Sequence, residues 1–256
     1  AAIAEHAANF DLATLLQHAE FRDDAYDGRR VDQSGLYNYQ EAIEAAGVPV
    51  YGIAGWSDSG YALGAIRRFI NSSLPAKRLL IGPWNHGGRV TYVPGTREAT
   101  TTSFDLATEL FRFFDYHLNG IDAGYAAEAP VHYFTSGIDQ WRTAPNWPVP
   151  GAMPVRWCFA SGNALGMDCN EADGVDNYFV DAAATSGGGN RWAGTMGPAP
   201  VTYPDRAEAD RLLLTFTSAR LGEAVEVTGE PVVTLYLATD AVDADVFVYL
   251  EEVTSA

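Results

Sequence analysis

The feature that most constrains the fold is a pair of short apolar segments separated by one amphipathic segment. Residues 48–54 are rich in β-branched and aromatic side chains and end at Gly55, which is typical of a strand buried on both faces. Residues 60–71 repeat apolar side chains at helical spacing, and Leu79–Ile81 is the second apolar segment. A strand, a crossover helix and a strand predict a parallel βαβ unit. We therefore expect part of an open α/β sheet.

Each predicted strand is followed by a loop that carries a titratable side chain. Asp58 follows the first strand and His86 follows the second. Parallel strands bring the loops at their carboxyl ends to one edge of the sheet, where open α/β sheets bind ligands. We therefore predict that Asp58 and His86 lie within hydrogen-bond distance as a catalytic acid–base pair, with the far imidazole nitrogen facing a cavity. The competing interpretation is structural, with Asp58 capping a helix and His86 filling a loop.

A hydrolase with such a pair also needs a nucleophile. In α/β-hydrolases the serine precedes the acid in a G-x-S-x-G turn, and the 256 residues contain no such motif. The serines before Asp58 are Ser34, in a polar stretch, and Ser57, beside the acid. We therefore expect the nucleophile and the oxyanion hole to lie upstream of Ala1.

The two loop motifs together resemble those of the cocaine-esterase-like hydrolases, which are related to the X-Pro dipeptidyl peptidases. G-W-x-D spans Gly55–Asp58, and G-P-W-x-H spans Gly82–His86. Further segments that fit the family are Phe21–Asp24, Phe113–Gly120, Trp141–Pro148, Asn190–Trp192 and the C-terminal TDAVDADVFVYL. The resemblance implies a Ser-Asp-His triad completed by Asp58 and His86, and it implies that both ends of the natural protein are missing.

The resemblance implies a serine hydrolase of ester or amide bonds, and it does not separate ester from X-Pro peptide cleavage. The isolated fragment is expected to be inactive, since it lacks the serine. The alternative is a degenerate hydrolase whose fold persists as a non-catalytic binding or interaction module. The sequence upstream of the chain would distinguish the serine hydrolase from the non-catalytic module.

Three regions are predicted. Residues 1–46 are expected to be the end of a helical cap, and residues 47–138 the C-terminal part of an α/β-hydrolase core. Residues 139–256 are expected to form a partial β-sandwich, which is a jelly roll in the resembled family.

Within the core, a further helix is expected over residues 103–119. Thr102 is the expected N-cap, with Asp105 three residues later as a variant of the capping box. Gly120 stands where a C-cap glycine belongs. The expected buried face consists of Phe104, Ala107, Leu110, Phe111 and Phe114.

The C-terminal region shows short segments of period-two alternation, which are typical of sandwich strands. The predicted strands cover residues 211–217, 225–227, 233–237 and 246–250. Leu214, Leu235 and Val248 are expected to face inward.

The charge balance restricts the partners. The chain has 16 basic and 33 acidic residues and a formal net charge of −17, the opposite of what a nucleic-acid backbone attracts. No apolar run reaches the length of a membrane span. We expect a small-molecule ester, amide or peptide substrate, no nucleic acid, no membrane, and homo-oligomerisation as an open option.

Neither a cofactor nor a metal is expected. Cys158 and Cys169 are the only cysteines, and they either form a disulfide or remain reduced thiols. No C-x-x-C or H-x-x-x-H motif accompanies them, which argues against zinc. Asp240, Asp243 and Asp245 lack the glycine and glutamate of an EF-hand loop, and a turn leading into a strand is the expected structure.

Overall fold

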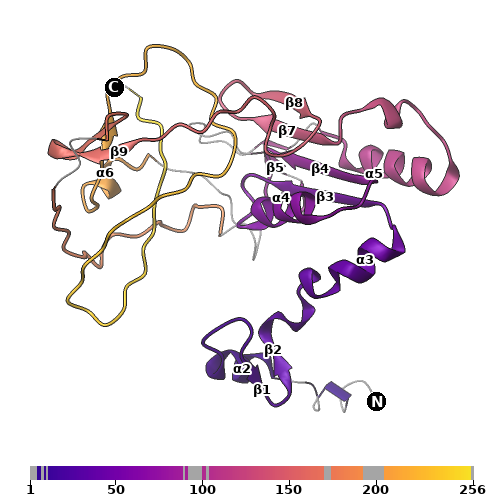
Figure 1. The fold of residues 1–256 in the computed structure, drawn as a ribbon, viewed down its shortest axis with the longest axis horizontal. Coiled ribbons are helices and arrows are strands. Elements are labelled where there is room, and N and C mark those ends of the chain that lie inside the picture. Colours follow the sequence, from indigo (N-terminus) through magenta and orange to yellow (C-terminus); the bar gives the residue numbers. More distant parts are fainter. Residues whose placement is uncertain are drawn as a thin grey trace. The chain divides into compact units, whose positions relative to one another are not determined.

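The structure, a computed structural model, describes residues 5–6, 9, 11–88, 90–91, 100–101, 104–169, 174–192 and 205–254. The chain divides into two compact units. The first comprises Ala1–Trp147 and Asn177–Leu214, and the second comprises Pro148–Asp176 and Thr215–Ala256. Figure 1 traces the elements of both units.

The first unit is built on a four-stranded mixed sheet with the order β3-β4-β7-β8. The strands are β3 (Val50–Gly55), β4 (Lys77–Gly82), β7 (Val131–Thr135) and β8 (Gln140–Ala144). The pairs β3–β4 and β4–β7 are parallel, and β8 joins β7 antiparallel. Helix α4 (Tyr61–Asn71) connects β3 to β4, so the predicted parallel βαβ unit is confirmed.

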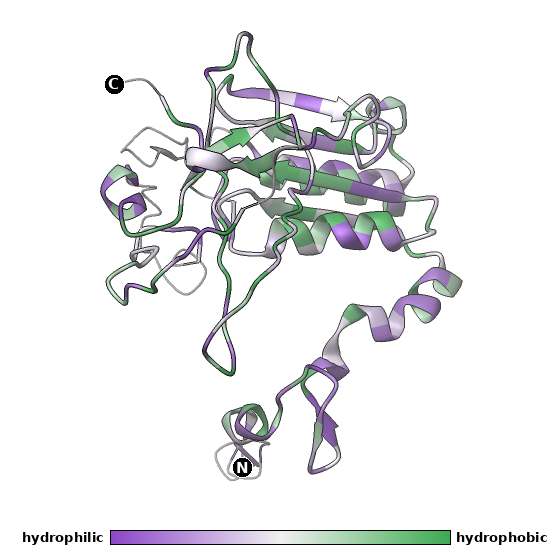
Figure 2. Cartoon of the chain, turned by 60° about the vertical axis from the view of Figure 1, so that its left-hand side comes forward, coloured by the Kyte–Doolittle hydropathy of each residue, from purple (hydrophilic) through white to green (hydrophobic). Residues whose placement is uncertain are grey.

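The core of this unit lies between α4 and the sheet. The buried side chains of α4 are Ala62, Ala65, Ile66 and Phe69. The fully buried strand residues include Leu79, Leu80, Ile81 and Val131. Figure 2 shows the central strands as mostly hydrophobic, which is the composition expected of parallel strands covered on both faces. Since the register brings Gly55 level with Gly82, both loops leave the sheet at one edge.

Helix α5 (Leu106–Phe114) corresponds to the helix expected over residues 103–119 and continues as a π-helical segment, Asp115–Asn119. It ends at Gly120, whose φ of 68° confirms the predicted left-handed C-cap. Asp105 is the N-cap, and its carboxylate accepts a hydrogen bond from a backbone N–H of the first turn. The predicted N-cap, Thr102, lies outside the described residues.

The predicted buried face of α5 is wrong. The helix buries Glu109 and Phe113 instead. The residues of the predicted face that are exposed are Ala107, Leu110, Phe111 and Phe114. The physical reason is a non-local polar contact: Glu109 accepts a hydrogen bond from Tyr51 of β3, and this bond holds that side of the helix against the sheet. Hydrophobic spacing alone could not have revealed this contact.

The N-terminal region is helical and irregular, as expected for residues 11–46. Its elements are α2 (Leu12–His18), β1 (Ala25–Tyr26), β2 (Arg29–Arg30), the 3-10 turns Val31–Ser34 and Leu36–Tyr39, and α3 (Gln40–Ala46). Asp11 caps α2 by accepting a hydrogen bond from the Ala13 N–H. Smaller elements of the first unit are the β5–β6 pair (Val90–Thr91, Thr100–Thr101), the turn Tyr125–Ala127 and α6 (Ala207–Asp210). The helices among the described residues are all too short or too polar to cross a membrane.

The second unit contains a small three-stranded sheet. Strands β9 (Cys158–Ala160) and β10 (Ala164–Gly166) pair antiparallel, and β11 (Thr217–Ser218) pairs parallel with β10. Cys158 and Cys169 form a disulfide with their Cα atoms 5.4 Å apart. The sequence left open whether these cysteines form a disulfide or remain reduced thiols, and in the structure they form the disulfide.

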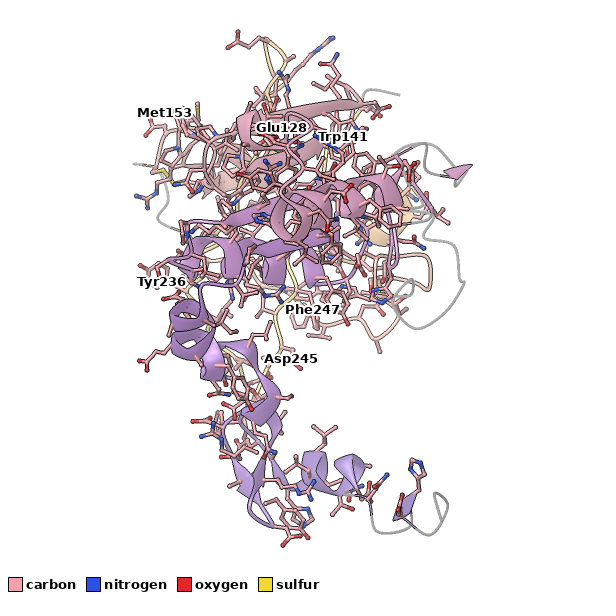
Figure 3. The ribbon with its side chains drawn as sticks, turned by 90° about the vertical axis from the view of Figure 1, so that its right-hand side faces the viewer. Glu128, Trp141, Met153, Tyr236, Asp245 and Phe247 are labelled. Atoms are coloured by element: carbon pink, nitrogen blue, oxygen red, sulfur yellow. A yellow bond between two sulfur atoms is a disulfide. The ribbon has the colours of Figure 1, made fainter. Side chains whose placement is uncertain are left out.

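The strands predicted for a sandwich are not formed in this structure, except that Thr217, the last residue of the predicted strand 211–217, belongs to β11. Residues 219–254 are described throughout and contain no strand. Leu214, Leu235 and Val248, expected to face inward, are 40%, 38% and 54% exposed. Tyr236 and Phe247, labelled in Figure 3, are exposed as well. Period-two alternation favours an extended backbone, but a strand also needs a neighbouring strand that pairs with its N–H and C=O groups, and none of the described residues 219–254 is part of such a pair of strands.

Candidate active site

Asp58 and His86 meet at the carboxyl edge of β3 and β4. The Nδ1 atom of His86 lies 3.0 Å from Oδ1 and 3.3 Å from Oδ2 of Asp58, which confirms the predicted distance. Because an ionised carboxylate only accepts hydrogen bonds, this contact places the imidazole hydrogen on Nδ1. The Asp58 side chain is 9% exposed and that of His86 is 52% exposed. No described residue forms a hydrogen bond with Nε2, and the His86 side chain is half exposed.

The backbone around Asp58 explains why its carboxylate is free to orient the imidazole. The N-cap of α4 is Gly60, and no side chain caps it. The Asp58 carbonyl accepts the Tyr61 N–H at 2.9 Å, so the backbone rather than the carboxylate begins the helix. The structural interpretation, in which Asp58 caps the helix through its side chain, does not match this arrangement.

The two loops are joined to one another by main-chain hydrogen bonds. The Trp56 N–H donates to the Gly82 carbonyl at 2.9 Å, and the Ser57 N–H donates to the Trp84 carbonyl at 3.3 Å. The Trp56 indole N–H also donates to the Phe134 carbonyl of β7 at 2.7 Å. The loop that carries the acid is therefore fixed to the loop that carries the histidine and to a third strand.

The glycines and one tryptophan of the two motifs have a packing role. The Trp84 ring is 2% exposed and lies where β3 and β4 end. A Cβ on Gly55 would overlap the Trp84 carbonyl oxygen, and a Cβ on Gly82 would overlap the indole ring. Trp84 also packs against Phe104 at 5.2 Å between ring centroids. Both strands end in glycine because only glycine leaves room for this side chain.

Sequence reasoning did not identify two further neighbours of the pair. The Tyr61 ring lies 5.3 Å from the His86 ring, centroid to centroid, and is half exposed. The segment Asn190–Trp192 reaches the acid loop, where the Arg191 carbonyl accepts the Ser59 N–H at 3.2 Å. Tyr61 could have been suspected because it lies only three residues after Asp58, where the next helix begins. The contact of Arg191 joins residues far apart in the sequence and leaves no local signal.

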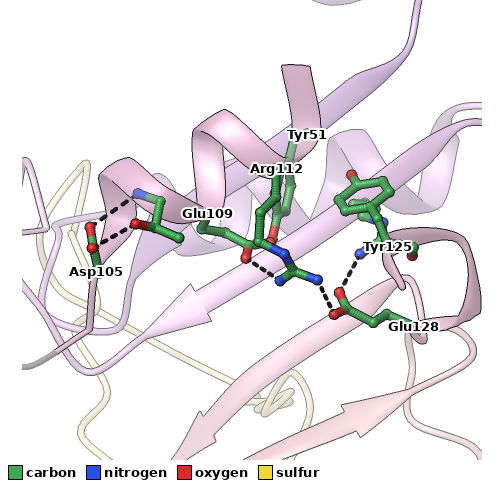
Figure 4. Close-up of polar contacts among 8 residues, drawn as sticks. Tyr51, Asp105, Glu109, Arg112, Tyr125 and Glu128 are labelled. Atoms are coloured by element: carbon green, nitrogen blue, oxygen red, sulfur yellow. Dashed lines mark hydrogen bonds and ion pairs between the residues drawn. The ribbon is translucent and has the colours of Figure 1, made fainter. Parts of the chain in front are cut away.

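A second polar cluster lies at the opposite edge of the sheet, where β4 and β7 begin. Figure 4 shows the chain of contacts. The Tyr51 hydroxyl donates to Glu109 at 2.7 Å, and Arg112 donates to Glu109 at 3.0 Å and also to Glu128. Arg78 donates to Glu128 at 3.0 Å. Every charge in this chain of contacts has a partner of opposite sign, which is the arrangement of a structural network.

Burial and charge pairing shift the ionisation of this cluster. Burial, with the hydrogen bond to Glu109, raises the pKa of Tyr51, and burial raises the pKa of Tyr125 to about 12. Partial burial works against ionised Glu128, but the hydrogen bonds from Arg112 and Arg78 outweigh it and lower the pKa of Glu128. A pocket of about 240 Å³ lies here, lined by residues that include Lys77, Arg78, Tyr116, His117, Tyr125 and Glu128. Among the described residues, no group of three or more His, Cys, Asp or Glu side chains could hold a metal.

Two family models match the chain. The X-Pro dipeptidyl-peptidase (S15 family) model matches residues 3–88, which include Asp58 and His86. The model of the X-Pro dipeptidyl-peptidase C-terminal non-catalytic domain matches residues 123–256, more than half of the chain.

Several curated proteins and solved structures are similar to parts of the chain. Proteins of Mycobacterium bovis and Mycobacterium tuberculosis, described as candidate serine esterases, are 38% identical over 98% of this chain and 43% of their own length. Cocaine esterase from Rhodococcus is 30% identical over 80% of this chain and 38% of its own length. A CocE/NonD family hydrolase from Staphylococcus aureus is 19% identical with a TM-score of 0.44, covering 62% of this chain and 26% of that one.

The chain thus spans less than half the length of the curated relatives it matches. The family models and the relatives agree with the motifs around Asp58 and His86. The chain belongs to the family of X-Pro dipeptidyl-peptidase and cocaine-esterase-like serine hydrolases, with an α/β-hydrolase-like fold followed by the family's C-terminal domain.

Proposed function

We propose that this chain supplies the acid and the base of a serine hydrolase that cleaves ester or amide bonds, X-Pro peptide bonds included. The observation that carries the proposal is the hydrogen bond between His86 Nδ1 and Asp58, with Nε2 left without a partner among the described residues. A structural histidine in a loop would be expected to use both nitrogens, whereas a general base needs one free lone pair.

The chemistry follows from this geometry. Nε2 of His86 takes the proton of a serine hydroxyl as the serine oxygen forms a bond to the substrate carbonyl carbon. Asp58 stabilises the imidazolium that results. The imidazolium then gives its proton to the leaving alcohol or amine as the bond to that group breaks, and an acyl-enzyme remains. Water, deprotonated by the same nitrogen, attacks the acyl-enzyme and releases the acid and the free serine.

The serine of this proposal lies upstream of Ala1. Strand β3 has a neighbour on only one side in the described sheet, although Gly52, Ala54 and Gly55 within it are buried. A strand that paired in parallel with this open edge would end at the same edge of the sheet as the loop of Asp58. This arrangement supports a nucleophile delivered by a preceding strand.

The finer domain assignment is also part of the proposal. Residues 1–46 would be the end of a cap, residues 47–138 the end of the hydrolase core, and residues 139–256 a jelly roll. Support for the last comes from the alternating segments between residues 211 and 250, which have the pattern of sandwich strands. These segments would become strands when the remaining strands of the sandwich pair with them.

A fluorophosphonate probe, which reacts covalently with activated serines, tests the proposal. The protein extended to the length of its curated relatives should be labelled at one serine upstream of Ala1, and the 256-residue chain alone should not be labelled. Asp58→Asn should slow the labelling strongly, whereas His6→Gln, a change at an exposed histidine, should not. An extended protein that resists the probe would instead favour a non-catalytic binding module.

A further inference from the structure

The residues before Trp192 form a turn that is closed by a single side chain. The amide nitrogen of Asn190 donates to the Gly187 carbonyl at 2.6 Å and lies 3.3 Å from both the carbonyl and the hydroxyl of Ser186. Its amide oxygen accepts the Trp192 N–H at 2.9 Å. Asn190 therefore uses its donor and its acceptor at once, and together these bonds define the conformation of residues 186–192.

This turn contacts the loop of the catalytic acid. The Arg191 carbonyl accepts the Ser59 N–H at 3.2 Å. The Trp192 ring lies against Gly60, where an added Cβ would be 3.6 Å from the nearest ring carbon. The Arg191 guanidinium lies 5.3 Å from the centre of the Trp192 ring. Both segments belong to the same compact unit. The residues that follow Asp58 are thus held from outside the βαβ unit.

The loop needs such support because its backbone is strained. Ser59 has a φ of 49°, in the left-handed region that side chains other than those of Gly, Asn and Asp rarely adopt. A residue in this region keeps its conformation only when surrounding contacts enforce it. Ser59 directly follows Asp58, so relaxation of its φ would rotate the peptide that sets the direction of the Asp58 carboxylate.

We propose that Asn190 is a positioning residue for the acid–base pair. It folds the turn that presents the Arg191 carbonyl and the Trp192 ring to Ser59 and Gly60, and this contact keeps Asp58 directed at His86. Asn190 itself touches neither Asp58 nor His86. The catalytic meaning of this contact rests on the proposed function, but the contact can be tested without catalysis.

The test uses the 256-residue chain, with amide hydrogen exchange and nitrogen NMR of the histidine ring as readouts. In Asn190→Ala we expect the Ser59 amide to exchange at least about tenfold faster, because it loses its acceptor. The signal of the Nδ1–H tautomer of His86 should be lost, because the carboxylate no longer fixes it. The Phe69 amide, in the core of α4, should exchange as before. Asn119→Ala is the matched control, because among the described residues the Asn119 side chain has a hydrogen bond only to Asp115.

Asn190→Asp is a second variant that keeps the acceptor for the Trp192 N–H and loses the two donors. It should give intermediate exchange at Ser59, and it keeps the test decisive if the alanine variant fails to fold. Unchanged Ser59 exchange, or an unchanged His86 tautomer, in both variants would overturn the proposal and leave the proposed function intact. The absence of the Nδ1–H tautomer in the unsubstituted chain would instead contradict the proposed function.

Discussion

At the scale of single residues, the surroundings of His117 in the folded protein change the pKa of its imidazole. Its ring centroid lies 4.7 Å from that of Phe113 and 5.8 Å from that of Tyr125. Burial, with the positive charge of Arg78, lowers the pKa of His117. Lys77, Arg78 and Glu128 line the same pocket. The folded protein therefore favours the neutral imidazole.

This lowered pKa predicts a pH dependence of stability. Below the ordinary histidine pKa of about 6.5, the unfolded chain binds the proton more readily than the folded one. The contribution of His117 to the free energy of unfolding should therefore be highest above about pH 6.5. It should fall as the pH decreases toward the lowered pKa of the folded state. His117→Gln should reduce the slope of the urea-unfolding free energy between about pH 5 and pH 7. A slope equal to that of the unsubstituted protein would contradict the assignment.

The candidate site was predictable from the sequence only where its signals are local. Asp58 and His86 each follow a short apolar strand, and parallel strands bring such loops together whatever the rest of the chain does. Asn190 lies in a segment that fits the family, but its place beside the acid loop was not predictable, because the contact between the Arg191 carbonyl and Ser59 leaves no periodic pattern in the sequence.

At the scale of elements, the end of β4 should tolerate no side chain at Gly82. A Cβ there would overlap the Trp84 ring, and the buried ring has little room to move. Gly82→Ala should lower the free energy of unfolding by about 1–3 kcal/mol, as overpacking does. Gly64→Ala is the matched control within α4, where a Cβ meets nothing within 4 Å.

The control should change stability in the opposite direction. Alanine at an exposed position of a helix is more favourable than glycine by roughly 0.5–1 kcal/mol, so Gly64→Ala should stabilise the protein. Urea unfolding of both variants gives the comparison. If Gly82→Ala proved neutral, Trp84 would not be held as described.

The elements themselves were predictable to different degrees. The βαβ unit was predictable because strand and helix periods and the glycines that end the strands are local signals. The buried face of α5 was not, since a buried Glu109 bonded to Tyr51 overrides the apolar pattern. The strands expected between residues 225 and 250 depend on partner strands, and the alternating pattern says nothing of where those partners come from.

At the scale of the whole molecule, the disulfide belongs to the second unit alone. Cys158 and Cys169 are 11 residues apart, and the bond closes the β9–β10 hairpin. Cys169→Ser should lower the local stability of this hairpin by about 3 kcal/mol, because the unfolded loop regains its freedom. Hydrogen exchange should show faster opening at Phe159 and Leu165, with α4 unaffected. Equal loss of protection in α4 would mean that the two units unfold as one.

This chain covers 43% of the length of its mycobacterial relatives, and we propose that catalysis needs the longer polypeptide. Their remaining length is where we place the serine and the oxyanion hole. Both members of the proposed acid–base pair, by contrast, lie in this chain: the Asp58 carboxylate is 9% exposed, 3.0 Å from the imidazole, and held by two loops that bond to each other.

The most direct test is the turnover of a p-nitrophenyl ester by the protein extended to the length of its relatives, with and without His86→Gln. Removal of a general base that acts on the nucleophile should lower kcat by about 1,000-fold or more. His6→Gln, the same change at an exposed histidine, should leave kcat unchanged. A His86→Gln protein that keeps kcat within about tenfold of the unsubstituted protein would contradict the assignment of His86 as the base.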